Sequence, residues 1–539
     1  MSIIPRIFLL AALPIIVGAT DAPTEIITPE SMRAHVEFLA SDALEGRETG
    51  TRGYDIAAEY VASRFRAMGM QPVSDKSWFQ QVPFNANLND EKAAKFSING
   101  RDFALRQDVR FGPARKSGTE VIKGDVVFAG FGIDDPKNGQ NDYKGIDAKG
   151  KIVAVLAGFP KGIASDIGAH YGRSKAKMAE ARGAIGVITI RTLEIERTRP
   201  WARSLNDPQH PSMGWMMPDG SSFDEAPAIQ FSAQLGDAAA AELFAAAPKK
   251  LATILAEADK DKGRPKGFKL KANVKIERTT SSNTVTSPNV IGMIPGSDPA
   301  LAGEYVLLMA HLDHNGIQAT KVGDNIFNGA MDNASGTATL LEAARALASG
   351  PKPRRSVIFA AVTAEERGLV GSDYLARNPV TAGGKVVAVV NLDMPVLLYD
   401  FQDVIAFGAE HSTMGDAVAR AAATQGVSLS PDPLPAEGLF TRSDHYSFVK
   451  QGVPSVFLMT GFKNGGEQQF QDFLKTHYHK VSDDLALPFD WNAAAKFARL
   501  NTAIAAEIAN APAAPLWYSD SFFGKTFAPT APKAERVKP

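Results

Sequence analysis

The sequence of 539 residues contains no cysteine. This absence excludes disulfide bonds, thiolate catalysis, cysteine-ligated structural zinc and lipid attachment through cysteine. If zinc binds, its protein ligands must be histidine nitrogens and carboxylate oxygens, a donor set that is typical of catalytic rather than structural zinc sites.

The sequence also has no excess of charge of either sign. Its 58 Lys and Arg residues nearly balance 59 Asp and Glu residues, which gives a formal net charge of −1. No segment interleaves basic and aromatic residues as nucleic-acid grooves do. We therefore expect neither nucleic acid nor an anionic membrane surface as a partner.

Long apolar runs are missing except at the N-terminus. Arg6 precedes an apolar stretch at 7–17, and small residues follow as far as Ala22. This pattern predicts a signal peptide at 1–22 and an exported protein, periplasmic or extracellular. The apolar stretch is too short to span a bilayer comfortably, so we expect no stable membrane insertion after cleavage. The alternative is an uncleaved anchor.

Strand-like and helix-like segments alternate from residue 289 onwards, which indicates an α/β fold. The pattern predicts a mostly parallel mixed sheet sandwiched by helices. We expect strands at 289–294, 305–310, 356–362, 386–390, 404–407 and 455–459. We expect helices at 336–348, 372–377, 414–425 and 491–510.

The chain is too long for one ordinary hydrophobic core, so we expect more than one domain. Short strands closed by glycines predict a smaller, β-rich inserted domain at 115–282, without a catalytic cluster. Within it, 194–223 is expected to be a long loop, and the isolated His170 and His210 are expected on the surface. The remaining predicted divisions are the main domain at 23–114 and 283–510 and a loosely packed Pro-rich tail at 511–539.

Several of the expected strands end in metal-binding residue types. His311 follows the strand at 305–310, Glu365 and Glu366 follow 356–362, Asp393 follows 386–390, and His477 and His479 lie beyond the last strand. Each residue alone has an ordinary explanation as a helix cap or a solvated side chain. Their recurrence at the carboxyl ends of strands in one sheet, where α/β folds bind ligands, is not explained in that way.

Two histidines and three carboxylates, with one further glutamate, suit a pair of zinc ions. Asp332, in the loop after His311, is the natural bridging carboxylate. His311 and Asp393 would complete one ion, and Glu366 and His479 the other. Glu365 would then lie beside the reacting water as a general base. Asp313 is expected to accept a hydrogen bond from the second ring nitrogen of His311.

The segments HLDH, NGAMDNASGTATLLE, TAEERGLVGS, NLDM, RSDHYSF and YHKVSDD resemble the double-zinc aminopeptidases of peptidase clan MH. That group also includes glutamate carboxypeptidase and the catalytically inactive transferrin receptor. The resemblance covers 283–510 and the N-terminal segment HVEFLASDALEGRETGTRGYDIAAEYV. The middle of the chain, with GKIVAVLAG and GAIGVI, resembles a protease-associated domain inserted into the peptidase fold.

The resemblance implies a set of site residues and a non-proline cis peptide bond after Asp332. His479 is preferred to His477 as a ligand because Tyr478 and His479 match the family's Tyr-His motif. The implied metal ligands are His311, Asp332, Glu366, Asp393 and His479, the implied base is Glu365, and Asp313 is the implied partner of His311. In the loop that resembles a substrate-facing segment of the family, Asp444, His445 and Tyr446 are expected near the substrate, with His445 or Tyr446 holding the oxyanion.

These observations predict a secreted zinc-dependent aminopeptidase that removes N-terminal residues from peptides and binds two zinc ions. A carboxypeptidase or dipeptidase on the same metals is the first alternative. Arg442 could bind a substrate carboxylate, whereas Asp444 or Asp373 could bind a free amine. A catalytically inactive, receptor-like binding protein is less favoured, because all five ligands and the base are present.

Overall fold

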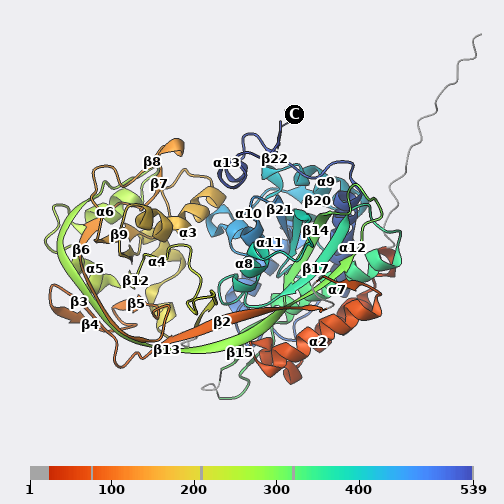
Figure 1. Ribbon diagram of the computed structural model, residues 1–539, viewed down its shortest axis with the longest axis horizontal. Helices are drawn as coiled ribbons and strands as arrows, with labels where there is room; N and C mark the ends of the chain where they lie inside the picture. The colour runs from red at the N-terminus through yellow and green to blue at the C-terminus, as the bar shows by residue number, and fades with distance from the viewer. Residues whose placement is uncertain (1–23, 74–76, 207–210, 319–321, 537–539) are drawn as a thin grey trace, which may run out of the picture.

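The computed structural model describes residues 24–73, 77–206, 211–318 and 322–536. Two lobes lie side by side and are joined by two long strands (Figure 1). We call the described residues of 24–73 and 291–536 the major lobe, and the described residues of 95–277 the minor lobe. The expected signal peptide and His210 fall outside the described residues.

The two joining strands are β2 (Phe79–Asn89) and β13 (Phe268–Ile294), which pair antiparallel with each other. The first part of β13 pairs with β6 (Gly118–Phe128) in the minor lobe, and its last five residues pair with β17 (Ser356–Val362) in the major lobe. One strand of 27 residues therefore belongs to both lobes and ties them together.

The sheet of the major lobe is mostly parallel, as the sequence predicted, and strands at both of its edges pair antiparallel. Its parallel strands, in spatial order, are β17, β14 (Glu304–His311), β18 (Lys385–Leu392) and β21 (Ser455–Thr460). At one edge, β19 (Asp403–Phe407) runs antiparallel to β21 and is followed by β20 (Ser428–Ser430). At the other edge, β13 runs antiparallel to β17 and pairs with β1 (Gln71–Pro72).

Helices cover both faces of this sheet, because its central strand is apolar on both sides. In β14, Val306 and Leu308 face the larger hydrophobic cluster, whereas Leu307 and Met309 face a second cluster. The helices on the first face are α1 (Pro29–Leu39), α2 (Arg52–Ala67), α7 (Ser335–Ser349), α9 (Met414–Thr424) and α12 (Trp491–Asn510). On the second face lie α8 (Val370–Arg377) and α10 (His445–Val449), and α11 (Gly466–Thr476) follows β21.

The minor lobe has its own hydrophobic core around parallel strands in the order β6, β9, β10 and β12. The bounds are β9 Ile152–Leu156, β10 Gly186–Ile190 and β12 Phe231–Leu235. The shorter strands are β3 (Lys95–Ile98), β4 (Arg101–Phe103), β5 (Val109–Phe111), β7 (Asp134–Asp135) and β8 (Gln140–Asn141). The lobe also contains α3 (Ser165–Ala181), α5 (Asp237–Leu243) and α6 (Leu251–Ala258). This core already includes Phe96, so the chain enters it before residue 115, the boundary expected from the sequence.

The segment at 194–223 is not the plain loop that the sequence predicted. It contains most of α4 (Leu193–Thr198) and all of β11 (Ser212–Trp215). The strand β11 forms because it pairs antiparallel with β2, from Ser212 opposite Asn87 to Trp215 opposite Phe84. This pairing joins residues more than 100 positions apart, and local sequence carries no signal of it.

The C-terminal segment is not loosely packed, so that expectation was wrong. Trp517 and Phe523 are buried, and β22 (Trp517–Tyr518) pairs with β23 (Lys533–Ala534) beside α13 (Phe522–Phe527). The aromatic side chains of this segment bury apolar surface that its prolines do not. His170, expected on the surface, is half-buried against the rings of Phe522 and Phe527. None of the helices within the described ranges is both long enough and apolar enough to cross a bilayer.

Candidate metal centre

Three neighbouring parallel strands end at the same edge of the major sheet. The strand β14 ends at His311, which lies opposite Val362 at the end of β17. Glu365 and Glu366 follow β17, and Asp393 follows the last residue of β18. Because parallel strands point the same way, their carboxyl ends bring these side chains together, as expected from the sequence.

The first group of possible ligands gathers around His311. Its Nε2 atom lies 3.2 Å from Oδ1 of Asp332 and 3.2 Å from Oδ1 of Asp393. Asp393 also accepts a hydrogen bond of 2.6 Å from Oγ of Ser443 through its other oxygen. One nitrogen and two carboxylate oxygens therefore face one point, as ligands of one metal ion do.

The second group uses the other oxygen of Asp332. The Nε2 atom of His479 lies 3.2 Å from Oδ2 of Asp332 and 3.3 Å from Oε2 of Glu366. His314, to which the sequence assigned no role, lies 2.7 Å through Nδ1 from Oε1 of Glu366. His477 faces Ser482 instead, with Nδ1 2.9 Å from its main-chain oxygen. Asp332 thus stands between the two groups.

The chemistry of this donor set fits zinc, which takes imidazole nitrogens and carboxylate oxygens in proteins. Asp332 and Glu366 are almost fully buried, so their charges require positive partners. Burial opposes the charged form of His311, but the adjacent Asp393 and Asp332 raise its pKa well above the ordinary value. The pKa of His479 is raised to about 9 by Glu366 and Asp332, against the effect of its own burial. The carboxylates therefore favour positive charge at both groups.

Asp313 is placed differently from the prediction. The Nδ1 atom of His311 lies 3.1 Å from the main-chain oxygen of Asp313 and 4.0 Å from its carboxylate. The predicted hydrogen bond is therefore made by the carbonyl group. The carboxylate accepts the main-chain N–H groups of Glu365 and Glu366 at 3.1 Å and 3.3 Å. It accordingly holds the loop that carries both glutamates.

Asp483 supports the loop that carries Asp332. Its carboxylate accepts the main-chain N–H groups of Met331 at 2.8 Å and Asp332 at 3.0 Å. The peptide bond between Asp332 and Asn333 is cis, as the resemblance implied. The side chain of Asn333 then accepts the N–H of Gly336 at 3.0 Å. These contacts fix the orientation of the shared carboxylate.

Arg47 is a supporting residue to which the sequence analysis assigned no role. Its buried guanidinium donates to the main-chain oxygens of Leu312 at 2.9 Å, Asn328 at 2.6 Å and Gly329 at 3.0 Å. Burial lowers its pKa to about 10, and it stays charged at neutral pH. Arg47 thereby fastens the two loops that carry His311 and Asp332 to the N-terminal segment. The sequence signal available for this role was that Arg47 lies in the N-terminal segment that resembles the peptidase family.

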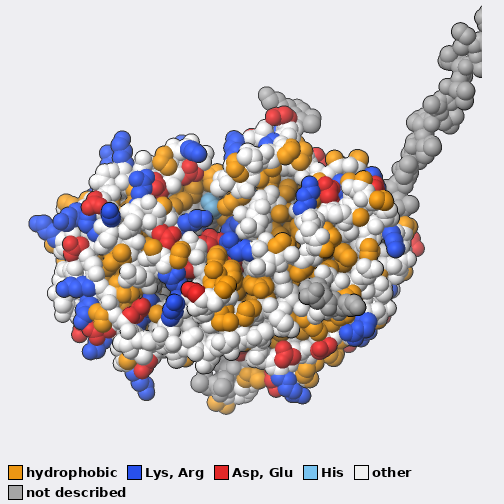
Figure 2. Space-filling view, viewed as in Figure 1, with side chains coloured by type: hydrophobic (Ala, Val, Ile, Leu, Met, Phe, Trp, Pro, Cys, Tyr) orange, Lys and Arg blue, Asp and Glu red, His pale blue; other side chains and the backbone are white. Residues whose placement is uncertain are grey.

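A cavity of about 530 Å³ opens onto the metal centre. Glu365, His311, Asp332, Asp393 and His479 all line it, together with residues from both lobes. Burial and the nearby carboxylates of Asp393, Asp444 and Glu366 raise the pKa of Glu365 well above its usual range. In Figure 2, charged side chains are visible along the line where the two lobes meet.

Tyr478 also lines this cavity, and the sequence gave it no role beyond identifying its neighbour. Its ring stacks on that of His479, with 3.8 Å between the centroids. Burial raises the pKa of its phenol well above 10, as do the charges of Asp332 and Glu366. Tyr478 therefore remains a hydrogen-bond donor inside the cavity at neutral pH.

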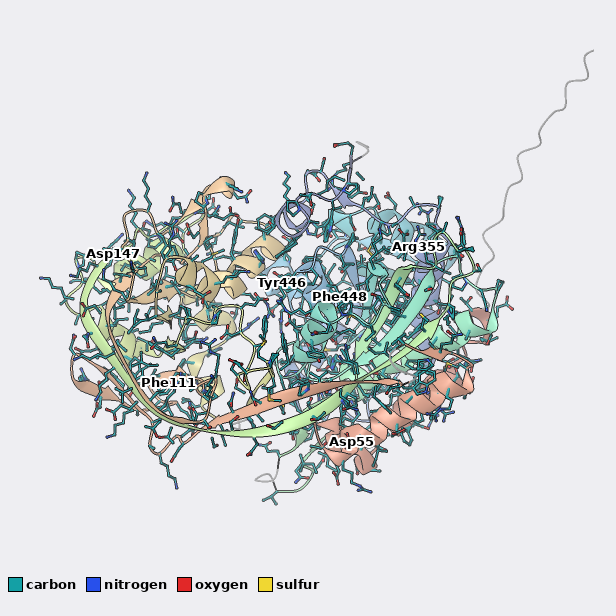
Figure 3. The ribbon with its side chains drawn as sticks, in the orientation of Figure 1. Asp55, Phe111, Asp147, Arg355, Tyr446 and Phe448 are labelled. Carbon is teal, nitrogen blue, oxygen red and sulfur yellow. The ribbon has the colours of Figure 1, made fainter. Side chains whose placement is uncertain are left out.

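The structure does not bring His445 and Tyr446 into this cavity, so that expectation is corrected. His445 is fully buried between the rings of Phe440 and Phe457. The hydroxyl of Tyr446 lies 2.5 Å from Nδ1 of His170 and faces the minor lobe, as its position in Figure 3 illustrates. Both belong to α10, whose turn directs successive side chains apart. Asp444 is fully buried, which raises its pKa to about 7, and it does not line the cavity.

The sequence of the major lobe resembles the sequences of known peptidases. Residues 289–505 match the sequence profile of peptidase family M28. A probable zinc metalloprotease of Pyrenophora tritici-repentis is 27% identical over 264 residues, which cover 43% of this chain and 53% of that protein. A probable glutamate carboxypeptidase of Arabidopsis thaliana is 25% identical over 380 residues, 64% of this chain and 49% of that protein. The chain thus matches about half the length of these relatives.

Among solved structures, an aminopeptidase from Aneurinibacillus sp. strain AM-1 resembles this chain with a TM-score of 0.52 and 20% identity. The similarity covers 92% of this chain and 96% of that one, so both lobes are included. It shows that the fold is shared.

Proposed function

We propose that this chain, whose residues 289–505 match the sequence profile of peptidase family M28, is a zinc-dependent metallopeptidase. The observation that carries the proposal is the pair of ligand groups that share Asp332, in one cavity with the free carboxylate of Glu365. A purely structural role does not account for this arrangement, because clustered buried carboxylates destabilise a fold that gains nothing from them.

The two groups are proposed to hold two zinc ions. His311 and Asp393 would bind one, His479 and Glu366 the other, and Asp332 would bridge them. Zinc ions bound there would supply Lewis-acid chemistry, which polarises a peptide carbonyl and makes a water molecule more acidic.

We propose that two side chains, those of Glu365 and Tyr478, take part directly in the hydrolysis of the peptide bond. The Glu365 carboxylate takes a proton from the attacking water and passes it to the departing amine when the peptide bond breaks. The phenol of Tyr478 donates a hydrogen bond to the oxygen of the attacked carbonyl as negative charge develops on it. Both side chains line the same cavity, as this proposal requires.

Within this class we propose an aminopeptidase. Four carboxylates, those of Asp332, Glu365, Glu366 and Asp393, surround the metal positions and balance the four positive charges of two zinc ions. Asp313, fully buried beside Glu365 and Glu366, adds a further acidic group. This end of the cavity therefore favours the positively charged amino terminus of a peptide over its carboxylate terminus.

Replacing Glu365 tests the catalytic proposal. We expect Glu365→Gln to reduce kcat on aminoacyl-p-nitroanilides by 10³-fold or more, because the proton acceptor is lost. Its zinc content, measured by atomic spectroscopy, should remain at two ions per chain, because Glu365 is not among the ligands. Near-normal kcat in this variant would sink the mechanism.

A matched set of peptides tests the direction of cleavage. Chelator-sensitive hydrolysis that is abolished by N-acetylation identifies an aminopeptidase. Hydrolysis that survives N-acetylation and is abolished by C-terminal amidation identifies a carboxypeptidase instead. No hydrolysis of any peptide by the protein with two bound zinc ions would contradict the proposed activity.

Two further features of the sequence complete the proposal. We propose that the minor lobe is the protease-associated domain that the sequence resembles, and that the chain is exported by the signal peptide predicted at 1–22. N-terminal sequencing of protein recovered outside the cytoplasm should then begin at or near residue 23. Recovery of an intact N-terminus there would contradict cleavage.

A further inference from the structure

The minor lobe faces the metal centre across the cavity with an arginine-rich wall. The lining residues Arg110, Arg191 and Arg199 come from the minor lobe, and Arg442 comes from the loop before α10. Apart from the metal-site carboxylates and Glu365, the acidic lining residue is Glu437. Arg191 is paired with Glu196 at 2.7 Å, so the cationic character of this wall comes from Arg199 and Arg442, which share Glu437.

Glu437 does not neutralise this wall. Its Oε2 atom lies 3.0 Å from a guanidinium nitrogen of Arg199 and 3.0 Å from one of Arg442. Two guanidinium groups, from different lobes, thus share a single carboxylate. Each guanidinium has five N–H donors, so both keep donors for another carboxylate.

Arg173 adds a cation from the helix that faces the major lobe. One face of α3 contacts that lobe, because Asp166 pairs with His411 and His170 contacts Tyr446. Arg173 follows His170 by three positions and so lies on the same face. Its charge is within electrostatic range of Glu365 and Arg442.

Arg173 has no hydrogen-bond or ion-pair partner within the part of the chain that the structure describes. It lines a cavity of about 790 Å³ that adjoins the metal cavity, since Thr198, Arg199, Gln234 and Glu437 line both. A peptide that extends from the metal centre towards the minor lobe therefore meets an arginine with all its donors available.

We infer that Arg173, together with Arg199 and Arg442, binds a carboxylate of the peptide substrate. The carboxylate is supplied by the free C-terminus of a short peptide or by an Asp or Glu side chain downstream of the cleaved bond. Guanidinium groups bind carboxylates in a planar, two-point geometry, which suits this role. A cavity of about 530 Å³ is of the size that encloses small ligands, so the inferred substrates are short acidic or free-ended peptides.

The inference rests on the proposed peptidase function, so the test separates the two. We would compare Leu-Ala-Ala with Leu-Ala-Ala amide, and Leu-Glu-Ala amide with Leu-Gln-Ala amide. Each peptide is assayed for kcat/KM with the zinc-loaded protein. Its binding to zinc-loaded Glu365→Gln protein is measured by calorimetry, which does not depend on turnover.

We expect the carboxylate member of at least one pair to be favoured about 10- to 100-fold in both measurements. The first pair reports on the C-terminus and the second on an acidic side chain. Arg173→Gln should remove most of this preference and leave the neutral peptides within about twofold. Arg173→Lys should restore part of it, because charge is kept and the two-point geometry is lost.

Arg182→Gln is the matched control, because Arg182 directly follows α3 and pairs with Asp134 outside these cavities. It should keep the full preference. Equal treatment of charged and neutral peptides by the unmodified protein, in turnover and in binding, would overturn the inference and leave the peptidase proposal standing. A preference that survives Arg173→Gln would overturn the assignment to Arg173. A binding preference without hydrolysis of any peptide would instead contradict the peptidase function alone.

Discussion

Asp483 shows how single residues outside the ligand set determine the geometry of this metal centre. It is fully buried and holds two consecutive main-chain N–H groups, those of Met331 and Asp332. A carboxylate can accept both bonds because each of its oxygens accepts one. Such groups commonly affect metal affinity almost as strongly as the ligands themselves.

The first prediction concerns this residue. Asp483→Asn keeps the size of the side chain but turns one oxygen into a donor, which would face a main-chain N–H. We expect zinc affinity, measured by competition with a chromogenic chelator, to fall about 10- to 100-fold. Asp484→Asn is the neighbouring control and should leave affinity unchanged. Unchanged affinity in Asp483→Asn would contradict the role assigned to it.

Glu342 of α7 is a second residue whose ionisation state is fixed by tertiary contacts. Its carboxylate accepts hydrogen bonds from Arg345 and Ser31 and lies 3.3 Å from Nε2 of His35. Burial alone would raise its pKa, but the bonds from Arg345, His35 and Ser31 outweigh burial and lower the pKa to about 2. Because the folded protein favours the ionised form, Glu342 stabilises the fold at neutral pH.

The second prediction is the pH dependence of this contribution. It is fully present above the ordinary glutamate pKa of 4.5 and is lost as the pH falls through about 2. Glu342→Gln should reduce the free energy of unfolding at pH 7 by on the order of 3 kcal/mol. Its denaturant midpoint should also vary less than that of the unmodified protein between pH 4.5 and pH 2. Glu37→Gln, at an exposed position on α1, should differ little at any pH. Parallel pH profiles for the unmodified protein and Glu342→Gln would contradict the assignment.

At the scale of elements, the N-terminus of α7 is shaped by the metal loop rather than by helix propensity. Gly336 lies in its first turn, where an added Cβ would come within 2.1 Å of Oδ1 of Asn333 and 2.5 Å of the main-chain oxygen of Leu392. A side chain there would displace Asn333 and with it the loop that carries Asp332. Glycine is required for close approach, although alanine is the better helix former.

The third prediction follows from this close approach. Gly336→Ala should destabilise the protein by about 1–3 kcal/mol and weaken zinc binding, despite the gain of about 1 kcal/mol in helix propensity. Gly172→Ala in α3 is the matched control, because nothing lies within 4 Å of its added Cβ. That substitution should stabilise the protein by about 0.5–1 kcal/mol. Thermal unfolding of the two variants should therefore shift in opposite directions, and shifts of the same sign would contradict the steric argument.

The elements were predicted unevenly, for a physical reason. The strand at 356–362 and the helix at 491–510 coincide with β17 and α12, because buried apolar runs and a capped amphipathic helix leave strong local patterns. The strand β11 and the packed C-terminal segment were missed. Both form through contacts with distant segments, β11 with β2 and Trp517 with Gly452.

At the scale of the whole molecule, the two lobes are joined by side chains as well as by β2 and β13. Glu225 of the minor lobe lies 2.9 Å from both Arg377 and Lys450 of the major lobe. Trp215 donates a hydrogen bond of 3.0 Å to Asp373. These contacts place the arginine-rich wall of the minor lobe opposite the metal centre of the major lobe.

The fourth prediction concerns the metal and the stability of the whole chain. Chelation of zinc removes the two metal cations from the buried carboxylates of Asp332, Glu366 and Asp393. We expect Tm to fall by several degrees, since a ligand present at 1,000 times its Kd contributes about 4 kcal/mol. Asp332→Ala, which lacks the shared ligand, should respond much less to the same chelator. An equal response of both proteins in differential scanning fluorimetry would contradict the shared role of Asp332.

The sequence by itself determined the α/β pattern and the position of His311, Glu365, Glu366 and Asp393 at strand ends, because parallel strands place their carboxyl ends at one edge whatever the side-chain details. It also determined the donor chemistry, since a chain without cysteine has only imidazole and carboxylate groups to offer zinc. Only the tertiary structure decided which other groups hold these site residues in place. The choice of the Asp313 carbonyl over its carboxylate, the hydrogen bonds of Arg47 to main-chain carbonyls, and the turning of Tyr446 towards His170 depend on side-chain directions and on contacts between distant segments. The arginine-rich wall opposite the metal centre also depends on the tertiary structure, because it exists only where the two lobes meet.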